Sequence, residues 1–172
     1  MKPLQCVCGF ECAKAWGNKQ TTKAINQDTR RRKLASKPKA ELLKEAQRFF
    51  NLYIRERDKH LGCISCGTTT SNQYAAGHYR SVGAMGALRF EELNVHKQCN
   101  RYCNMELSGN IINYRINLVK KIGLEKVEWL EGPHQPKHYT IEEIKQIKIL
   151  YKEKTKALTQ INEEPARIGW DE

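Results

Sequence analysis

Two closely spaced pairs of cysteines constrain this chain more than any other feature of its sequence. The first pair is Cys63 and Cys66, and the second is Cys99 and Cys103. Each pair can fold as a knuckle, and two knuckles together present four thiolates in the tetrahedral arrangement that Zn²⁺ prefers. A site with four cysteines has no open coordination position, so we expect its zinc ion to be structural and to replace core that a small strand-rich segment does not supply.

The charge balance indicates an anionic partner. The 172 residues include 30 Lys and Arg against 19 Asp and Glu, a formal net charge of +11. Such an excess concentrates polyanions near the protein, and each cation that neutralises a phosphate releases counterions. DNA is the first candidate partner and an acidic membrane surface the second. The sequence predicts neither a transmembrane helix nor a signal peptide, so we expect a cytoplasmic protein whose cysteines bind metal rather than form disulfides.

The sequence divides into three segments. Residues 1–39 form a basic arm, residues 40–158 hold the cysteine pairs, and residues 159–172 form an acidic tail that we expect to be disordered. The arm has little apolar surface to bury, which favours a mobile or partly helical segment. Its cysteines, which are Cys6, Cys8 and Cys12, indicate either a second zinc site completed from elsewhere or an incomplete site. Its phosphate-binding candidates are Arg30, Arg31, Arg32 and Lys33.

Apolar periodicity predicts an α+β fold. A helical stripe begins near Pro38, a second helix is expected after Cys103, and a third runs from near Asn110 to a stop at Gly123. A fourth helix begins at Thr140, where Thr140-Ile-Glu-Glu143 has the pattern of a capping box. Between residues 62 and 89 the helical period disappears, which indicates short strands and loops.

A second signal lies between and beside the cysteine pairs. It consists of His78 in the segment Ala-Gly-His-Tyr-Arg, Asn94 two residues before His96, and Asn104 directly after the last cysteine. Here the chain resembles the HNH, or ββα-metal, endonucleases, including the phage enzymes that resolve DNA junctions. The resemblance implies a small ββα-metal core stapled by the four-cysteine zinc site and surrounded by helices.

The same resemblance implies a role for each residue. His78 is the candidate general base, Asn94 braces the loop of the hairpin, and Asn104 ligates a catalytic Mg²⁺ or Mn²⁺ ion. A neutral imidazole can accept a proton from water, and a hard cation prefers oxygen ligands and can polarise a phosphate. His78 could instead be a structural histidine, and Asn104 could simply cap a helix. For His96 three roles stay open: metal ligand, phosphate contact, or brace of the knuckle.

Two positions depart from the HNH pattern. Gly77 stands where many of these nucleases carry an acidic residue or a histidine, and Ala75 stands where an aspartate is frequent. The carboxylate ligand of the catalytic ion is therefore either missing or supplied by another part of the chain. The candidate replacements are Glu91, Glu92, Glu106 and the nitrogen ligand His96.

A more specific resemblance is to the NinG family of lambdoid phages, also called Rap. It covers roughly residues 35 to 158 and rests on motifs that coincide in order and spacing. These motifs lie at residues 54–58, 63–67, 76–80, 88–90, 94–99, 107–110 and 140–143. The resemblance implies a phage recombination nuclease that acts on branched DNA, such as Holliday junctions and D-loops, in the cytoplasm of the host bacterium.

The leading hypothesis is a metal-dependent, structure-selective DNA endonuclease that hydrolyses phosphodiester bonds. We expect it to act as a homodimer, because junction resolution needs paired cuts on two strands. The basic residues near its motifs that we expect to contact DNA are Arg80, Arg89, Lys97 and Arg101. An alternative is a non-catalytic, zinc-containing DNA-binding protein that assists recombination and does not need His78. A zinc adaptor for a protein partner would explain the cysteines but not the charge.

Overall fold

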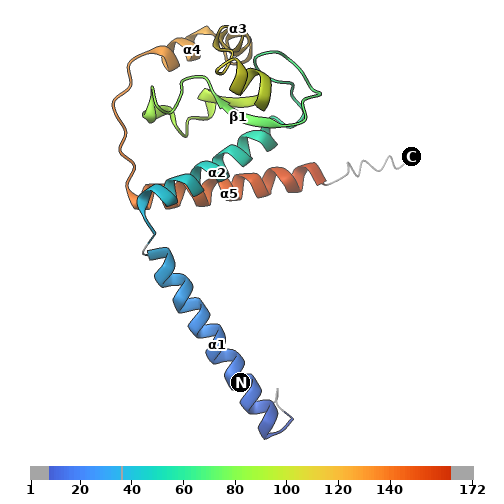
Figure 1. Cartoon of the computed structure of the whole chain (residues 1–172), viewed down its shortest axis with the longest axis vertical. Coiled ribbons are helices and arrows are strands. Elements are labelled where there is room, and N and C mark those ends of the chain that lie inside the picture. Colours follow the sequence, from blue (N-terminus) through green and yellow to red (C-terminus); the bar gives the residue numbers. More distant parts are fainter. Residues whose placement is uncertain (1–7, 36, 164–172) are drawn as a thin grey trace, which may run out of the picture. The chain divides into compact units, whose positions relative to one another are not determined.

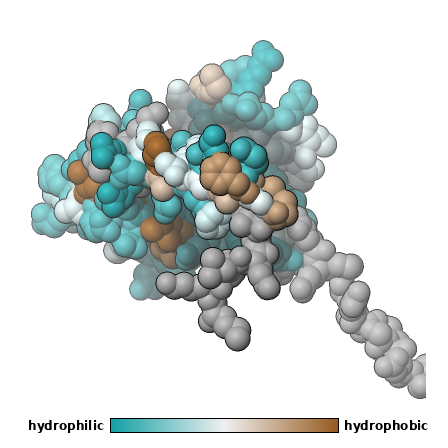
Figure 2. Space-filling view, turned by 90° about the horizontal axis from the view of Figure 1, so that it is seen from below, coloured by the Kyte–Doolittle hydropathy of each residue, from teal (hydrophilic) through white to brown (hydrophobic). Residues whose placement is uncertain are grey.

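The structure, a computed structural model, describes residues 8–35 and 37–163 and divides into two compact units between Glu41 and Leu42. The first unit contains one long helix, and the second contains the cysteine pairs and the proposed catalytic residues. On the face drawn in Figure 2, most of the surface is hydrophilic and the hydrophobic residues form small separate patches. Among the described residues, no helix combines the length and the apolar character needed to cross a bilayer.

The basic arm forms a continuous helix, α1 (Phe10–Ala35), whose side chains are almost all exposed where they are described. We expected a mobile or partly helical segment. The helix forms without an apolar face because Lys, Arg, Gln and Ala lose little side-chain freedom in a helix. Asp28 also forms ion pairs with Arg31 and Arg32, at 2.9 and 2.7 Å, along one face of the last turns.

In the second unit, α2 (Lys39–Arg57) and α5 (Ile141–Glu163) lie side by side (Figure 1). The predicted apolar stripe of α2 is buried, and Phe50 meets Tyr151 of α5 edge to face at 4.7 Å between ring centroids. The capping box at the start of α5 is confirmed, because Thr140 and Glu143 exchange hydrogen bonds between side chain and backbone N–H. Both helices contribute to one buried hydrophobic cluster, which also includes Val95. The two helices therefore pack against the segment that contains Val95.

The sheet has two antiparallel strands, β1 (Tyr74–His78) and β2 (Val95–Cys99). In the register, Gly77 pairs with His96 and His78 pairs with Val95. Side chains alternate between the two faces of a strand, and paired residues share a face. His78 and His96 therefore lie on opposite faces of the hairpin. The connection between the strands contains two 3₁₀ turns, η1 (Gly86–Leu88) and η2 (Glu92–Asn94).

After β2 the chain forms η3 (Asn100–Glu106), α3 (Ile111–Ile122) and α4 (Leu124–Glu131). The turn before α3 is unusual, because Ser108, Gly109 and Asn110 have φ values of 48°, 93° and 46°. A second core cluster joins this region to the residues that follow β1. Its buried members are Tyr79, Leu88, Tyr114, Leu118, Val127 and Leu130.

The mixed, helix-rich α+β fold, with its small sheet and its four-cysteine cluster, agrees with the sequence prediction. The predicted stop of the third helix at Gly123 is also confirmed, with a φ of 89°. The structure differs from the sequence prediction in three places. The segment around Cys103 winds as a π-helix from Asn100 rather than starting after the cysteine, and the eight-residue helix α4 carried too weak a periodic signal to be predicted. The tail prediction is wrong for residues 159–163, which continue α5, and residues 164–172 lie outside the described residues.

Candidate active site and metal centre

The four cysteines of the two pairs converge on one point. Their sulfur atoms all lie within 4.8 Å of one another, and Sγ of Cys66 is 3.8 Å from Sγ of Cys99. Four sulfurs bound to one tetrahedral ion at about 2.3 Å each would lie about 3.8 Å apart. The geometry and the all-thiol donor set thus fit a metal such as zinc. Cys63, Cys99 and Cys103 are buried, and Cys66 is exposed.

Local backbone geometry builds both knuckles. The N–H of Gly67 donates to the carbonyl of Cys63 at 2.8 Å, and Gly67 has a φ of 76°, which glycine adopts without steric cost. In the second knuckle, the backbone N–H of Cys103 donates to Sγ of Cys99 at 3.4 Å. Asn110 donates from its side chain to Sγ of Cys103 at 3.5 Å. Burial raises the pKa of the Cys99 and Cys103 thiols, so a bound cation must displace their protons.

His78 and Asn104 line the same surface hollow, which has a volume of about 610 Å³. We call it the His78 hollow. His78 comes from the end of β1, and Asn104 comes from η3, directly after the last cysteine. The remaining lining residues are Ala76, Tyr79, Arg80, Ser81, Val82, Ala84, Ser108, Gly109 and Ile111. The hairpin and the second knuckle therefore bring two of the predicted catalytic residues to one place.

The imidazole of His78 is held in one tautomer. Its Nε2 lies 3.0 Å from the carbonyl oxygen of Arg89, which can only accept, so Nε2 carries the proton and Nδ1 is the free acceptor. Burial lowers the pKa of His78; the hydrogen bond to the Arg89 carbonyl opposes this effect, and the Arg89 charge adds to it. At neutral pH the ring is thus an uncharged base with one nitrogen available.

Asn94 lies directly before β2, and Asn104 lies in η3. Asn94 is fully buried and braces the chain after β1. Its Oδ1 accepts from the N–H of Arg80 at 2.8 Å, and its Nδ2 donates to the carbonyls of Arg80 and Leu88. Asn104 donates from Nδ2 to Oδ1 of Asn100 at 3.3 Å. Among the described residues its own Oδ1 has no hydrogen-bond donor, which leaves one carboxamide oxygen free at the hollow.

No carboxylate lines the His78 hollow among the described residues. A side chain at position 77 would meet Gln98, because a Cβ there would lie 2.3 Å from Oε1 of Gln98. The three glutamates that were candidates for the missing carboxylate have other partners. Glu91 accepts from the N–H of Leu93, Glu92 binds Lys154 and Tyr53, and Glu106 forms an ion pair with Arg101.

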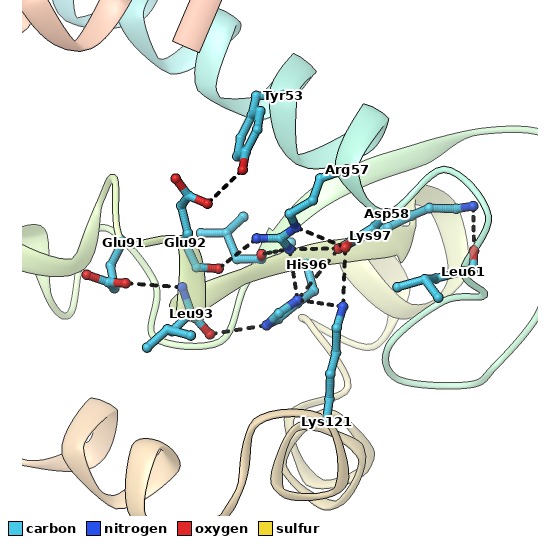
Figure 3. Close-up of polar contacts among 12 residues, drawn as sticks. Tyr53, Arg57, Asp58, Leu61, Glu91, Glu92, Leu93, His96, Lys97 and Lys121 are labelled. Carbon is cyan, nitrogen blue, oxygen red and sulfur yellow. Dashed lines mark hydrogen bonds and ion pairs between the residues drawn. The ribbon is translucent and has the colours of Figure 1, made fainter. Parts of the chain in front are cut away.

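His96 lies in a buried polar network on the far side of the hairpin (Figure 3). Its Nδ1 is 3.0 Å from both Nη2 of Arg57 and Nζ of Lys121, and 3.6 Å from Oδ2 of Asp58. Its Nε2 donates to the carbonyl of Leu93 at 3.1 Å. This position argues against His96 as a ligand beside His78 and against a phosphate contact. The strand register is the reason, because it turns the two rings to opposite faces.

The network around Asp58 was not predicted from the sequence. Asp58 accepts from Arg57 at 2.8 and 3.0 Å, from Lys121 at 3.2 Å and from the backbone N–H of Lys97 at 3.1 Å. Burial alone would raise the pKa of Asp58, but the nearby His96, the hydrogen bonds from Arg57 and the charges of Arg57 and Lys121 hold it well below its usual range. The only sequence signal was a charged Arg-Asp pair where an apolar stripe ends.

The predicted DNA-binding residues fall into different environments. Arg80 lines the His78 hollow, and its Nε is buried without a hydrogen-bond partner among the described residues. Arg89 lies next to the site and donates to Gln47, and Arg101 is 91 % exposed. Lys97 is the exception, because it is buried and its Nζ donates to the carbonyls of Lys59 and Leu61 at the end of α2. The expectation that Lys97 contacts DNA is therefore not supported by its position.

The N-terminal candidates all belong to the first unit. Arg30, Arg31 and Arg32 are exposed on α1, and the side chain of Lys33 lies outside the described residues. Cys8 and Cys12 are exposed one helical turn apart, with their sulfurs 2.9 Å from each other. Cys6, the third cysteine of the possible second metal site, lies outside the described residues.

Comparison with known proteins gives a consistent set of matches. The family model described as "Bacteriophage Lambda NinG protein" matches residues 1–163. "Protein ninG" of Escherichia phage lambda is 50 % identical over 135 residues, which are 78 % of this chain and 66 % of that protein. The proteins of the same name from Salmonella phage P22 and Enterobacteria phage H19B are each 48 % identical over 135 residues, covering 78 % of this chain and 66 % and 67 % of their own lengths. The aligned part thus spans about two thirds of these relatives, and no solved structure matches significantly.

Proposed function

Because the chain belongs to the NinG family of bacteriophage proteins, we propose that it is a metal-dependent DNA endonuclease that acts on branched recombination intermediates. One observation carries the proposal: His78 and Asn104 line one hollow together with the half-buried Arg80. A base, an oxygen ligand and a guanidinium whose Nε has no hydrogen-bond partner among the described residues are groups that can serve phosphodiester hydrolysis. The strands β1 and β2 with η3 would then form a ββα-metal core.

The proposed reaction begins with a water molecule beside His78. Nδ1 of His78 accepts its proton, and the hydroxide attacks the scissile phosphorus. The carbonyl of Arg89 holds the imidazole in the required tautomer, and Asn94 positions the segment that carries Arg80. The guanidinium of Arg80 neutralises the phosphate, and two bonds to a phosphate would also satisfy its buried Nε.

Asn104 would hold the divalent cation through Oδ1. When bound, an Mg²⁺ or Mn²⁺ ion polarises the phosphate and stabilises the departing 3′-oxygen. The hollow offers a single free carboxamide oxygen and no carboxylate among the described residues, which fits a hard cation only weakly. Phosphate oxygens of DNA and water molecules must therefore complete its coordination, so we expect the cation to bind chiefly as part of the DNA complex.

We base the preference for branched DNA on the family motifs. We base DNA as the partner on the net charge of +11 and on the basic helix α1. Dimer formation belongs to the same proposal, because paired cuts across a junction suit a two-fold symmetric protein. The structural zinc completes the proposal, with Cys63, Cys66, Cys99 and Cys103 as ligands.

A second candidate function is a zinc-containing DNA-binding protein without catalysis. The absence of a carboxylate among the described residues that line the His78 hollow favours it. The two functions are separated by incubating the purified protein with a four-way junction and with a linear duplex of matched sequence, each with and without Mg²⁺. The nuclease predicts Mg²⁺-dependent nicks in the junction. Tight junction binding without any product under these conditions would support the accessory protein instead.

A further inference from the structure

A second hollow lies beside the proposed active site and has no role in the reaction described above. Its volume is about 580 Å³, within the range of roughly 300–1,000 Å³ that is usual for small-molecule sites. It is lined by Ser65, Cys66, Gly67, Tyr102, Leu107, Asn110, Asn113 and Asn117. We call it the Tyr102 hollow.

The two hollows are lined by neighbouring residues of the same segments. The turn η3 carries Asn104 into the His78 hollow and Tyr102 into the Tyr102 hollow. Likewise, Asn110 lines the second hollow and its neighbour Ile111 lines the first. A nucleotide close to a phosphate in the first hollow could therefore place its base in the second, because adjacent groups of one strand are only a few bonds apart.

The chemistry of the Tyr102 hollow fits a planar base. Tyr102 is 56 % exposed and Leu107 is 43 % exposed, so the hollow offers an aromatic residue and an aliphatic neighbour to solvent. Stacking on an aromatic ring is available only to a base that has left its own stack. A fully paired duplex cannot offer such a base, whereas a branch point or a bulge can.

The carboxamides of the Tyr102 hollow are oriented by their partners. Asn110 donates to Sγ of Cys103 and accepts from Nδ2 of Asn113, and Asn117 donates from Nδ2 to the carbonyls of Ile64 and Ser65. Among the described residues, Oδ1 of Asn113 and Oδ1 of Asn117 accept no hydrogen bond. The hollow therefore presents two acceptors, which suit the exocyclic amino group of cytosine, adenine or guanine.

Charge complementarity points to the same occupant. Lys120 follows Asn117 by three residues on α3 and is exposed. Residues three and four apart lie on the same side of a helix, so a cation sits one turn beyond the carboxamides. It can neutralise the phosphate of the nucleotide whose base enters the hollow.

We propose that the Tyr102 hollow binds an unstacked, amino-bearing nucleobase of branched DNA and so recognises the branch next to the cleavage site. This inference rests on the proposed function because it takes branched DNA as the ligand. It does not depend on cleavage of that DNA. The cysteine knuckles orient the site, since Cys66 and Gly67 line it and Cys103 anchors Asn110. Tyr102 is on this account a specificity residue and takes no part in hydrolysis.

The test measures binding in EDTA, so that cleavage plays no part. Fluorescence anisotropy compares a linear duplex with the same duplex carrying one bulged cytosine or one bulged thymine. We expect Tyr102→Ala to weaken binding to the bulged cytosine at least tenfold, about 1.4 kcal/mol, and to leave binding to the paired duplex unchanged. Tyr102→Phe should retain the wild-type preference, because the ring is kept. Trp129→Ala, which removes an aromatic side chain of similar exposure on α4, serves as the matched control.

Two results would overturn the proposal. The first is an equal loss, or no loss, of affinity for bulged and paired DNA in Tyr102→Ala, and the second is equal wild-type affinity for bulged cytosine and bulged thymine. Zinc content and circular dichroism verify that the variants are folded. Failure of the proposed nuclease would appear separately, as wild-type protein that selects the bulged duplex in EDTA but cuts nothing with Mg²⁺.

Discussion

Nε2 of His78 donates a hydrogen bond to the carbonyl oxygen of Arg89 at 3.0 Å, and this bond leaves Nδ1 as the unprotonated nitrogen of the ring. A backbone carbonyl cannot rotate away or change its charge, so it selects one tautomer permanently. The bond would be of little consequence in a purely structural histidine. In a general base it keeps Nδ1 ready to accept a proton.

The pH profile of cleavage should reflect this environment. Burial lowers the pKa of His78 from its ordinary value of 6.5, so the ring is neutral at pH 7. The single-turnover rate should therefore be flat around neutral pH and fall only when the pH drops below 6.5. Rates measured on a junction between pH 5 and 8, with constant Mg²⁺, provide the test. A rate that is still rising above pH 7.5 would assign the limiting ionisation to another group.

The cysteine cluster should hold one zinc ion per chain. Cys66→Ser is expected to lower both the zinc content and the midpoint of thermal unfolding, because metal binding at such a site is coupled to folding. Elemental analysis and calorimetry measure the two quantities. Cys12→Ser, which changes an exposed cysteine of the first unit, should alter neither. A fully folded, zinc-free protein of undiminished stability would contradict the assignment.

The buried network should make stability depend on pH. Burial, with the charges of Lys121 and Arg57, lowers the pKa of His96 below 6.5, while Asp58 opposes the shift. The unfolded chain then binds a proton more readily than the folded protein, so stability is lost as the pH falls below 6.5. Asp58 acts in the same direction at lower pH, because its folded pKa is depressed and its stabilisation is lost on protonation.

Thermal unfolding of wild type and His96→Gln between pH 7.5 and 5 tests this dependence. The variant should lose less stability on acidification than the wild type, whatever its absolute melting temperature. His138→Gln, at an exposed histidine, is the control and should match the wild-type slope. Zinc content is followed at each pH, because loss of metal would mimic the effect. Parallel slopes for wild type and His96→Gln would remove His96 as the titrating group.

The basic helix should bind phosphates without regard to DNA sequence. Replacing Arg30, Arg31, Arg32 and Lys33 with Gln is expected to weaken binding to all DNA forms and to flatten the dependence of log Kd on log salt. The slope should change by about 0.9 for each duplex phosphate that the helix no longer neutralises, while the preference for junction over duplex survives. Lys152→Gln with Lys156→Gln, at exposed lysines of α5, is a control for overall charge. Loss of the junction preference with an unchanged duplex salt slope would instead assign branch recognition to α1.

Much of the fold was predictable because it follows from local rules. The cysteine spacing predicted the cluster, the apolar stripe predicted the buried face of α2, and Thr140 with Glu143 predicted the start of α5. The motifs predicted that His78 and Asn104 act together, and the register of the hairpin places His78 and His96 on opposite faces. A register is set by long-range packing, which no local pattern reveals.

The remaining features depend on tertiary contacts that the sequence hides. Lys97 has the sequence pattern of a surface cation, yet its ammonium group donates to the carbonyls of Lys59 and Leu61, which follow α2. Asp58 is one acid among many in the sequence, yet it gathers Arg57 and Lys121 around His96. The vacant Cβ position of Gly77 is explained only when the side chain of Gln98 is seen to fill that space.

The central claim, that His78 is the general base of a nuclease, is tested most directly by the single-turnover rate at which His78→Ala cleaves a four-way junction with Mg²⁺. Kd for the same junction is measured in parallel in EDTA, with His138→Ala as the matched control. Loss of a general base should lower the rate by about 10²–10⁴-fold while Kd, zinc content and melting temperature stay near those of the wild type. A His78→Ala variant that cleaves the junction at the wild-type rate would contradict the account.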